Sequence, residues 1–311
     1  MASSLWGLTI HFHFNLRNLP PLHRHGTQDI IGEMKAGLED CGHFVSLDDQ
    51  DFFAAPVINL IFENFTEETV PSLRAFKQEA GDGLIFGVIC GEDLLDPLIM
   101  DGEFSWRRDA MMQAAEIADF VWTLIPNVEE YGRFTDADKV FWFELGYSDR
   151  IRTIQRAPHC DIDVFMPGNL YPYRETAVNA LTARGLKVRS SNYQMPINVY
   201  QSIAGRSKVI LDIGRDKGLR FLSSTRIILG VNNEIVVVSE KFDQSPLKFF
   251  YDYTVAAKSD DLVDLCEQTV RDPSVIELGQ AMTKRFQVDH PVGPKVMRLL
   301  ENPNFLKLVH G

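Results

Sequence analysis

Residues 207–240 read SKVILDIGRDKGLRFLSSTRIILGVNNEIVVVSE, and this stretch decides the fold. Two apolar runs, at 208–213 and 235–239, are typical of buried strands. Between them, 225–232 has the length of a short helix. It begins with Thr225 and follows two serines, and both residue types favour helix N-caps. A strand, a helix and a second strand in succession predict a parallel pair joined by a helical crossover.

The same alternation runs along the rest of the chain. Apolar runs predict further strands near 8–14, 44–47, 57–62, 84–89, 120–124, 140–143, 163–166, 186–188 and 253–257. Helices are predicted near 27–41, 72–79, 105–118, 173–184, 199–204, 259–270, 274–286 and 294–301.

A polar, aperiodic stretch at 147–160 interrupts this alternation and is typical of a linker. We therefore predict an α/β protein of two Rossmann-like domains, 1–146 and 161–290, facing a central cleft. A C-terminal helix at 291–311 could pack back on the first domain. Ligands of open α/β folds bind at the carboxyl ends of the strands, so both sheets would contribute to that cleft.

Composition argues against several classes of protein. The formal charge of −12 argues against partners that need a basic surface, such as nucleic acid or an anionic membrane. No apolar run approaches the ~18–20 residues of a membrane span, and residues 1–16 lack the pattern of a signal peptide. The four cysteines lie far apart, which is typical of free thiols in a reducing cytoplasm. We expect a cytoplasmic protein, and the absence of GxGxxG argues against a dinucleotide-binding half.

The segment 163–174, DVFMPGNLYPYR, combines a strand, a glycine turn and the start of a helix. Backbone N–H groups at such a helix start can bind an anion, and Gly168, Asn169 and Arg174 are the residues placed to do so. An ordinary strand-to-helix turn with a surface arginine explains the same residues.

A second candidate anion site opens the helix at 225–232. Ser224 and Thr225 could hold a diphosphate, or they could simply cap the helix. Capping does not explain Arg226, because a cation in the first turn opposes the helix dipole. Arg226 is therefore the stronger indication of an anionic ligand.

Polar residues in two of the buried strands are further candidates. Lys208 could contact a phosphate or be a solvated strand end, and Asp212 lies late in the same strand, near the predicted cleft. Glu240 ends the next strand, where a carboxylate can bind ribose hydroxyls. A loop glutamate is the simpler alternative for Glu240.

In the first half, the loop between the first strand and the first helix contains His25, Gly26 and Thr27, and Thr27 is a plausible N-cap. His11 and His13 alternate along the first strand, so both point to one face. Two such histidines could ligate a metal. No further ligand lies nearby in sequence, so we expect a packed or hydrogen-bonded pair and no metal site.

Carboxylates follow two strands of the first half. Glu92 and Asp93 come directly after the strand at 84–89, and Glu63 follows the strand at 57–62. Such residues are well placed for a general base, which must reach the hydroxyl that it deprotonates. They could equally cap the next short segment.

The order of these segments resembles the bacterial GT-B glycosyltransferases of the CgeB-like, glycosyl transferases group 1 type. The matching segments are 163–174, 184–188, 207–212, 224–227, 236–240 and 262–273, with 143–147 before the linker. In the first half, 25–27 and 41–45 resemble more loosely the corresponding parts of an acceptor-side domain. The resemblance covers about 140–275 well and 8–146 loosely.

The resemblance implies a metal-independent glycosyltransferase that requires no cofactor beyond its donor, a UDP- or GDP-sugar. Gly168 and Arg226 would meet the diphosphate, and Glu240 would meet the ribose or the sugar. The first domain would bind the acceptor, which could be a glycan, a protein or a small molecule, through the Gly26–Thr27 loop and Glu63.

The mechanism stays open at this point. An inverting enzyme would use a base in the first domain, Asp93 or Glu92 and then His25, whereas a retaining enzyme needs none. Many relatives carry a ribose-binding Glu where this chain has Leu229. A catalytically silent binding or assembly protein is therefore one alternative, and a nucleotide-sugar epimerase of the same architecture is another.

Overall fold

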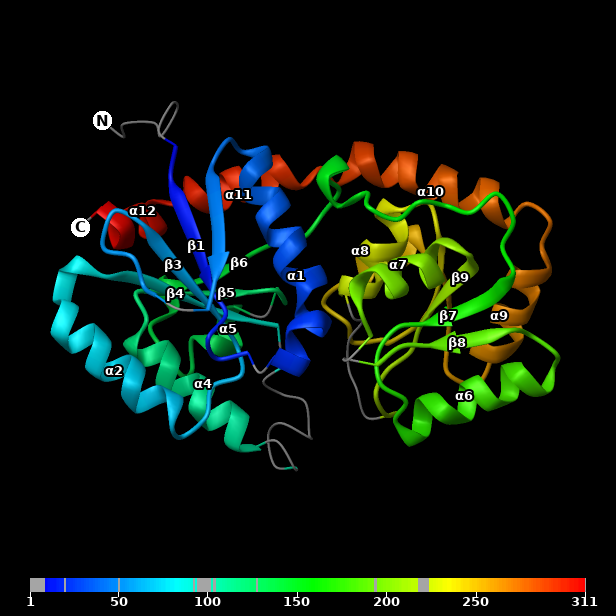
Figure 1. Cartoon of the computed structure of the whole chain (residues 1–311), viewed down its shortest axis with the longest axis horizontal. Helices are drawn as coiled ribbons and strands as arrows, with labels where there is room; N and C mark the ends of the chain where they lie inside the picture. The colour runs from blue at the N-terminus through cyan, green and yellow to red at the C-terminus, as the bar shows by residue number, and fades with distance from the viewer. Residues whose placement is uncertain are drawn as a thin grey trace. The chain divides into compact units, whose positions relative to one another are not determined.

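A computed structural model describes residues 9–19, 21–49, 51–91, 93, 102, 105–126, 128–192, 195–217 and 224–310, except for the side chains of 21–28 and 309–310. The chain divides into two compact units. The first comprises residues 1–20, 34–145 and 292–311, and the second comprises 21–33 and 146–291. Each unit is built around its own parallel sheet (Figure 1). The stretch 147–160 and the first part of helix α1 thus belong to the second unit.

The sheet of the first unit has six strands in the order β2-β1-β3-β4-β5-β6, and all of its pairings are parallel. The strands are β1 (His11–Asn15), β2 (Phe44–Asp48), β3 (Ile58–Phe62), β4 (Ile85–Cys90), β5 (Phe120–Thr123) and β6 (Val140–Trp142). The helices are α1 (Pro21–Asp40), α2 (Thr69–Ala80), α4 (Ser105–Ile117), α5 (Val128–Tyr131), α11 (Val292–Leu300) and α12 (Pro303–His310). The six strands predicted here are confirmed within a few residues. Helix α5 was missed, and the C-terminal helix expected at 291–311 is two helices, α11 and α12.

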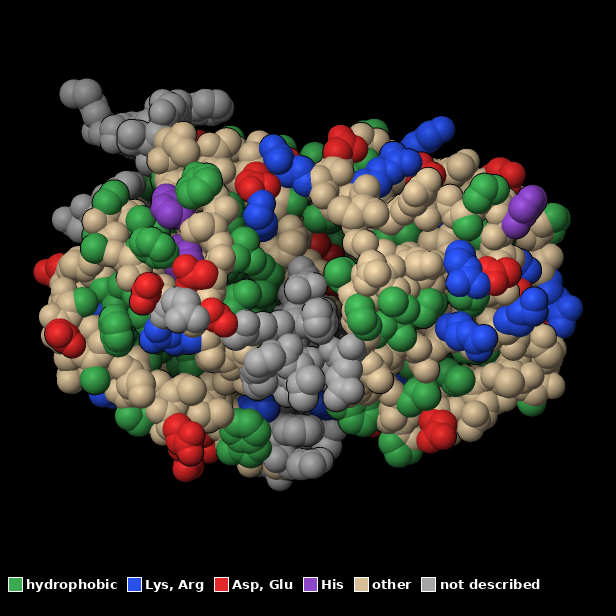
Figure 2. Space-filling model, in the orientation of Figure 1, with side chains coloured by type: hydrophobic (Ala, Val, Ile, Leu, Met, Phe, Trp, Pro, Cys, Tyr) green, Lys and Arg blue, Asp and Glu red, His purple; other side chains and the backbone are tan. Residues whose placement is uncertain are grey.

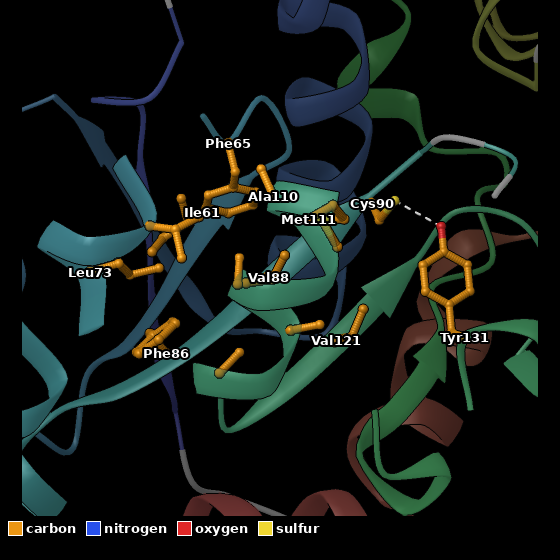
Figure 3. Close-up of a cluster of buried hydrophobic side chains, with 14 of the residues drawn as sticks. Ile61, Phe65, Leu73, Phe86, Val88, Cys90, Ala110, Met111, Val121 and Tyr131 are labelled. Carbon is orange, nitrogen blue, oxygen red and sulfur yellow. Dashed lines mark hydrogen bonds between the residues drawn. The ribbon is translucent and has the colours of Figure 1, made fainter. Parts of the chain in front are cut away.

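The two faces of this sheet are covered by different helices. On one face, buried side chains of β3, β4 and β5 pack with those of α2 and α4 (Figure 3). On the other face, Phe305 of α12 packs edge-on against Phe120 and Phe141. Gly37 of α1 lies so close to Val292 and Val296 that an added Cβ would be 3.0 Å from each. Burial on both faces explains why these strands are near-continuous apolar runs.

Helix α1 begins earlier than the sequence predicted. The loop expected at 25–27 and the N-cap expected at Thr27 are wrong, because the helix starts at Pro21. Proline suits the first helical position, where its missing N–H would have no partner and its φ is already helical. Gly26 and Thr27 therefore lie on a helix, and the side chains of 21–28, including that of His25, are outside the described residues.

The second unit has five parallel strands in the order β11-β10-β9-β7-β8. The strands are β7 (Ile162–Met166), β8 (Val188–Ser190), β9 (Ser207–Asp212), β10 (Val236–Glu240) and β11 (Val255–Ala257). The helices are α6 (Pro172–Ala183), α7 (Ile197–Gly205), α8 (Ser224–Asn232), α9 (Leu262–Arg271) and α10 (Val275–Asp289), with 3-10 helices at Asp149–Ile151 and Lys248–Tyr253. The strand predicted at 186–188 starts two residues later.

Close packing of α8 on the sheet positions the start of that helix. Gly230 lies against β10 so tightly that an added Cβ would be 2.2 Å from Val237 Cγ2. Glycine therefore lets the helix approach the strand closely. On the opposite face, α6 and α9 cover Val164, Val209 and Val236. The helix that carries Arg226 is thus held rigidly over the sheet.

Candidate functional site

In the second unit, three predicted site residues meet at the carboxyl edge of the sheet. Asp212 ends β9 and Glu240 ends β10, and the turn at Gly168 follows β7, the other neighbour of β9. Parallel strands end at the same edge, where open α/β folds bind their ligands. The sheet therefore brings these three residues to one edge, and their role in binding a ligand stays a prediction.

Gly168 has a backbone conformation that favours glycine. Its φ is +100°, and its N–H donates to Ser191 Oγ at 2.8 Å. A Cβ at this position would lie 3.3 Å from Arg174 Nη1 and 3.5 Å from Arg226 Nη2. Glycine therefore allows two guanidinium groups to lie against the backbone of one turn.

Arg226 is held by a buried acid. Its Nη1 lies 2.8 Å from Asp212 Oδ1, and its Nε donates to the carbonyl oxygen of Pro167 at 3.0 Å. The other Asp212 oxygen accepts from Ser239 Oγ at 3.0 Å. Asp212 offsets the unfavourable position of a cation at the start of α8. Among the described residues, Nη2 of Arg226 has no hydrogen-bond partner, so this end of the guanidinium group can donate hydrogen bonds to a ligand.

Arg174 ties two loops together. Its Nε lies 3.2 Å from the carbonyl oxygens of both Ile213 and Gly214, and its Nη1 donates to the carbonyl oxygen of Asn169 at 3.0 Å. The side chain is buried. Arg174 thus supports the loop after β9 and brings a positive charge beside Gly168. Asn169 contributes a carbonyl oxygen to this arrangement.

A third arginine lies in the same region and was missed in the sequence. The guanidinium carbons of Arg174 and Arg215 lie 5.6 and 5.9 Å from the ring centroid of Tyr171. Both distances are within the range of cation–π attraction. Arg215 lies three residues after the end of β9, so its place after a strand that ends in a polar residue was the available signal.

Glu240 is almost fully buried and accepts two hydrogen bonds. Tyr173 O–H donates to Oε1 at 2.6 Å, and Gly214 N–H donates to Oε2 at 2.9 Å. Burial raises the pKa of Glu240, and these two hydrogen bonds oppose that rise. Glu240, at the end of β10, therefore holds the loop after β9 in place through its hydrogen bond with Gly214.

The other predicted residues of this unit lie at different places. Ser224 and Thr225 form the start of α8, next to Arg226, and both are partly exposed. Lys208 lies at the amino end of β9, at the opposite edge of the sheet, where its Nζ is 2.8 Å from Asp163 Oδ1. The structure thus separates Lys208 from the Gly168 turn.

Two acidic residues of α1 also belong to this unit and were not singled out in the sequence. Burial raises the pKa of Asp29 to about 6, and a side-chain hydrogen bond with Tyr200 opposes the rise. Burial and the charge of Asp29 raise the pKa of Glu33. Their spacing of four residues on a helix was the signal that could have indicated an acidic pair.

In the first unit, carboxylates again lie at the carboxyl edge of the sheet. Glu63, which follows β3, accepts from Gly91 N–H through Oε2 at 2.8 Å. Asp93 is 4% exposed, and Glu92 lies outside the described residues. The sheet therefore brings Glu63 to the start of the segment that contains Asp93, as adjacent strand ends predict.

In the described part of the chain, no cluster of three or more His, Cys, Asp and Glu is arranged to hold a metal ion. Within the same residues, no helix combines the length and the apolar character that a membrane crossing requires.

No protein-family model matches the sequence, and the search of curated proteins gave no match. Solved structures do resemble it. An alpha-glucosyltransferase in complex with UDP and a 13-mer DNA containing an HMU base has a TM-score of 0.60 at 11% identity, over 98% of this chain and 100% of that one. The same kind of enzyme with a mismatched DNA gives 0.55 at 12% identity, over 91% and 95%.

TarM is a further similar structure, with a TM-score of 0.53 at 12% identity. The match covers 82% of this chain but only 55% of TarM, so the chain spans about half the length of that relative. Identities this low establish the fold alone. The chain has the α/β fold of GT-B glycosyltransferases, with two parallel sheets, as the sequence predicted.

Proposed function

We propose that this protein is a glycosyltransferase whose second unit binds a nucleotide diphosphate sugar. The observation that carries the proposal is the approach of two guanidinium groups, those of Arg174 and Arg226, to the backbone of Gly168. Arginine is the side chain best suited to phosphate oxygens, because it offers several donors in one plane. The UDP in the alpha-glucosyltransferase of the same fold supports a UDP-sugar as donor, with a GDP-sugar as the alternative.

The proposed reaction breaks the bond between the sugar's anomeric carbon and the diphosphate oxygen. Negative charge then grows on the departing nucleotide diphosphate. Arg226 Nη2 and the N–H groups at the start of α8, near Ser224 and Thr225, would stabilise that charge without rearranging. This matches the metal-independent route that the family resemblance implies.

The roles of the remaining residues follow from their contacts. Asp212 holds Arg226, and Glu240 holds the loop after β9, so we propose that both position the donor site. Asp93 and Glu92, and then His25, remain the proposed bases for an inverting reaction, although His25 falls in the second unit. Glu63, Gly26 and Thr27 remain proposed for the acceptor side. We also propose that the protein is of the CgeB-like subtype and that it is located in the cytoplasm.

A second candidate function is binding without turnover. Leu229 lies in α8 and is 9% exposed, at the position where related enzymes carry a ribose-binding glutamate. An alkyl side chain cannot accept hydrogen bonds from ribose hydroxyls. This substitution favours a protein that binds the diphosphate but positions the sugar poorly for reaction.

Titration calorimetry against UDP-, GDP-, ADP- and CMP-sugars tests the donor site. We expect heat with one nucleotide class and none with the others. Arg226→Met should abolish that heat, and so should Arg226→Met combined with Asp212→Asn, a pair that leaves no unpaired buried charge. The absence of heat with every nucleotide would refute the proposal.

Release of nucleotide from the bound donor then separates the two candidates. A transferase should slowly hydrolyse its donor in the absence of acceptor, whereas a binding protein should return it intact. Lys208→Met is the matched control, because this cation lies at the opposite edge of the same sheet. It should bind the donor as the wild-type protein does.

A further inference from the structure

A second cluster of reactive side chains lies on the first unit, on the sheet face formed by β1 and β2. The parallel register pairs His11 with Phe44 and His13 with Ser46. Ser46 Oγ lies 2.7 Å from His11 Nε2 and 2.8 Å from His13 Nδ1. The other ring nitrogen of His13, Nε2, is 3.3 Å from Asp48 Oδ1. The Ser46 hydroxyl, the His13 imidazole and the Asp48 carboxylate thus lie next to one another in space, in that order.

The partners of His13 determine where its proton lies. The Asp48 carboxylate lies 3.3 Å from Nε2, outside hydrogen-bond geometry, and its negative charge favours the tautomer with the ring hydrogen on Nε2. In that tautomer Nδ1 accepts from the Ser46 hydroxyl. Ser46 Oγ in turn accepts from His11 Nε2. Burial lowers the pKa of His13 against the opposing effect of Asp48. A neutral imidazole therefore faces the hydroxyl, as a general base must.

The Ser46 hydroxyl lies in surroundings that are partly open to solvent and partly lined by aromatic rings. Ser46 and His11 are partly exposed, and the Asp48 side chain is 38% exposed. Phe44 packs on His11 at 4.6 Å between ring centroids and is 57% exposed; Phe53 packs edge-on to His13, also at 4.6 Å, and is 38% exposed. Figure 2 shows histidine side chains at the surface in this region, beside hydrophobic ones.

Phe53 is held in place by a neighbouring strand. Asn59 of β3 accepts from Phe53 N–H at 2.9 Å and donates to the carbonyl oxygen of Phe53 at 2.9 Å. The β1–β3 register pairs Asn59 with His13, so both residues lie on the same face. The ring of Phe53 is therefore held in a fixed position beside His13, close to the Ser46 hydroxyl.

We infer that Ser46 is an activated nucleophile of an acyl-transfer site, and that small apolar esters are its substrate class. This arrangement follows the logic of a nucleophile, a base and an orienting acid, which recurs on unrelated folds. Ser46 Oγ attacks the ester carbonyl carbon while its proton passes to His13 Nδ1. The bond to the leaving alcohol oxygen breaks, and His13 gives the proton to that oxygen.

Water completes the cycle. It attacks the acyl carbon on Ser46, its proton passes to His13, and the carboxylic acid leaves as His13 returns a proton to Ser46 Oγ. His11 Nε2, 2.7 Å from Ser46 Oγ, would donate to the carbonyl oxygen as that oxygen gains negative charge. None of these residues belongs to the proposed nucleotide site, so the two proposals stand or fall separately.

The full chain treated with a fluorophosphonate probe provides the test. We expect mass mapping to locate the adduct on Ser46, and p-nitrophenyl acetate to be hydrolysed. Ser46→Ala should abolish both, and His13→Gln should slow them by about 100-fold, the lower end of what a positioned base contributes. Asp48→Asn, at a partly exposed site, should slow them about tenfold and covers the case in which His13→Gln fails to fold.

The matched control is Ser72→Ala. Ser72 is exposed on α2, and its hydroxyl donates to the carbonyl oxygen of Glu68 rather than to an imidazole. This variant should be labelled as fast as the wild-type protein. Failure to label Ser46, or labelling that is as fast in Asp48→Asn as in the wild type, would overturn the inference. Retention of nucleotide binding in Ser46→Ala would show that the variant altered only the site at Ser46.

Discussion

The guanidinium group of Arg226 and the carboxylate of Asp212 form an ion pair of 2.8 Å that joins the first turn of α8 to the end of β9. Asp212 is 2% exposed, so its carboxylate is buried against this partner. The same contact aims the other end of the guanidinium group at the Gly168 turn. Structure and ligand binding at this edge are therefore coupled through one pair of residues.

Removing only the cation should destabilise the second unit. We expect Arg226→Met to lower the free energy of unfolding by about 3 kcal/mol, because it leaves a buried carboxylate unpaired. The double variant Arg226→Met with Asp212→Asn should regain most of that loss, since the amide can still accept from Ser239. Urea denaturation of the three proteins measures this difference. Equal losses in the single and double variants would mean that the pair is not coupled.

Gly168→Ala should weaken donor binding in addition to destabilising the fold. The added Cβ would lie 3.3 and 3.5 Å from the two guanidinium groups, in a backbone with φ of +100°. We expect affinity for the bound nucleotide to fall about tenfold, which corresponds to about 1.4 kcal/mol. Calorimetry of the variant measures this change.

Gly185→Ala is the matched control for backbone strain. Its φ is +83°, and a Cβ there would meet nothing within 4 Å. Both variants should lose about 1–2 kcal/mol of stability from the left-handed conformation. Only Gly168→Ala should lose affinity. A similar loss of affinity in Gly185→Ala would place the effect in general destabilisation.

The buried carboxylate of Glu240 should make stability depend on pH. Its folded-state pKa is raised, so the proton is held more tightly in the folded protein than in the unfolded chain. Its contribution is therefore fully present below the ordinary glutamate pKa of 4.5 and is lost as pH rises through the folded pKa. Relative to Glu240→Gln, the wild-type protein should lose stability as pH rises above that value. Urea denaturation at several pH values measures it.

Glu267→Gln is the control of opposite sign. Hydrogen bonds from Arg271 and Arg184 lower the pKa of Glu267. Its contribution is present above the unfolded pKa and is lost as pH falls through the folded one. Relative to Glu267→Gln, the wild-type protein should therefore lose stability toward acid. Parallel slopes in the two variants would contradict the assignment for Glu240.

Asn232 should protect the backbone N–H of Ser148 from hydrogen exchange. It is fully buried, and its Oδ1 accepts from Ser148 N–H at 3.0 Å. Asn232→Ala leaves that buried N–H without its acceptor, which costs about 1–3 kcal/mol. We expect faster hydrogen exchange at Ser148, measured by mass spectrometry. Asn304→Ala, which removes an exposed contact to Asp138, should leave exchange at Ser148 unchanged.

The alternation of apolar runs was enough to predict two parallel sheets, because buried strands need apolar residues at successive positions. Element boundaries were less certain. Pro21 starts α1 six residues before the predicted cap, since a proline that reads as a loop signal is also a good first helical residue. Arg226 was singled out by its conflict with the helix dipole, and its role toward a ligand stays a prediction. The sequence offered no way to identify Asp212 as its partner.

The sequence by itself determined the α/β class, the parallel strands and the edge where polar residues gather, because these depend on local periodicity and on where strands end. Only the tertiary structure decided which of those residues meet. It placed Lys208 at the opposite edge from Gly168, and it brought Ser46 to His13, 33 positions earlier in the chain. Strand order and register, set by burial and backbone pairing across the whole sheet, govern such contacts.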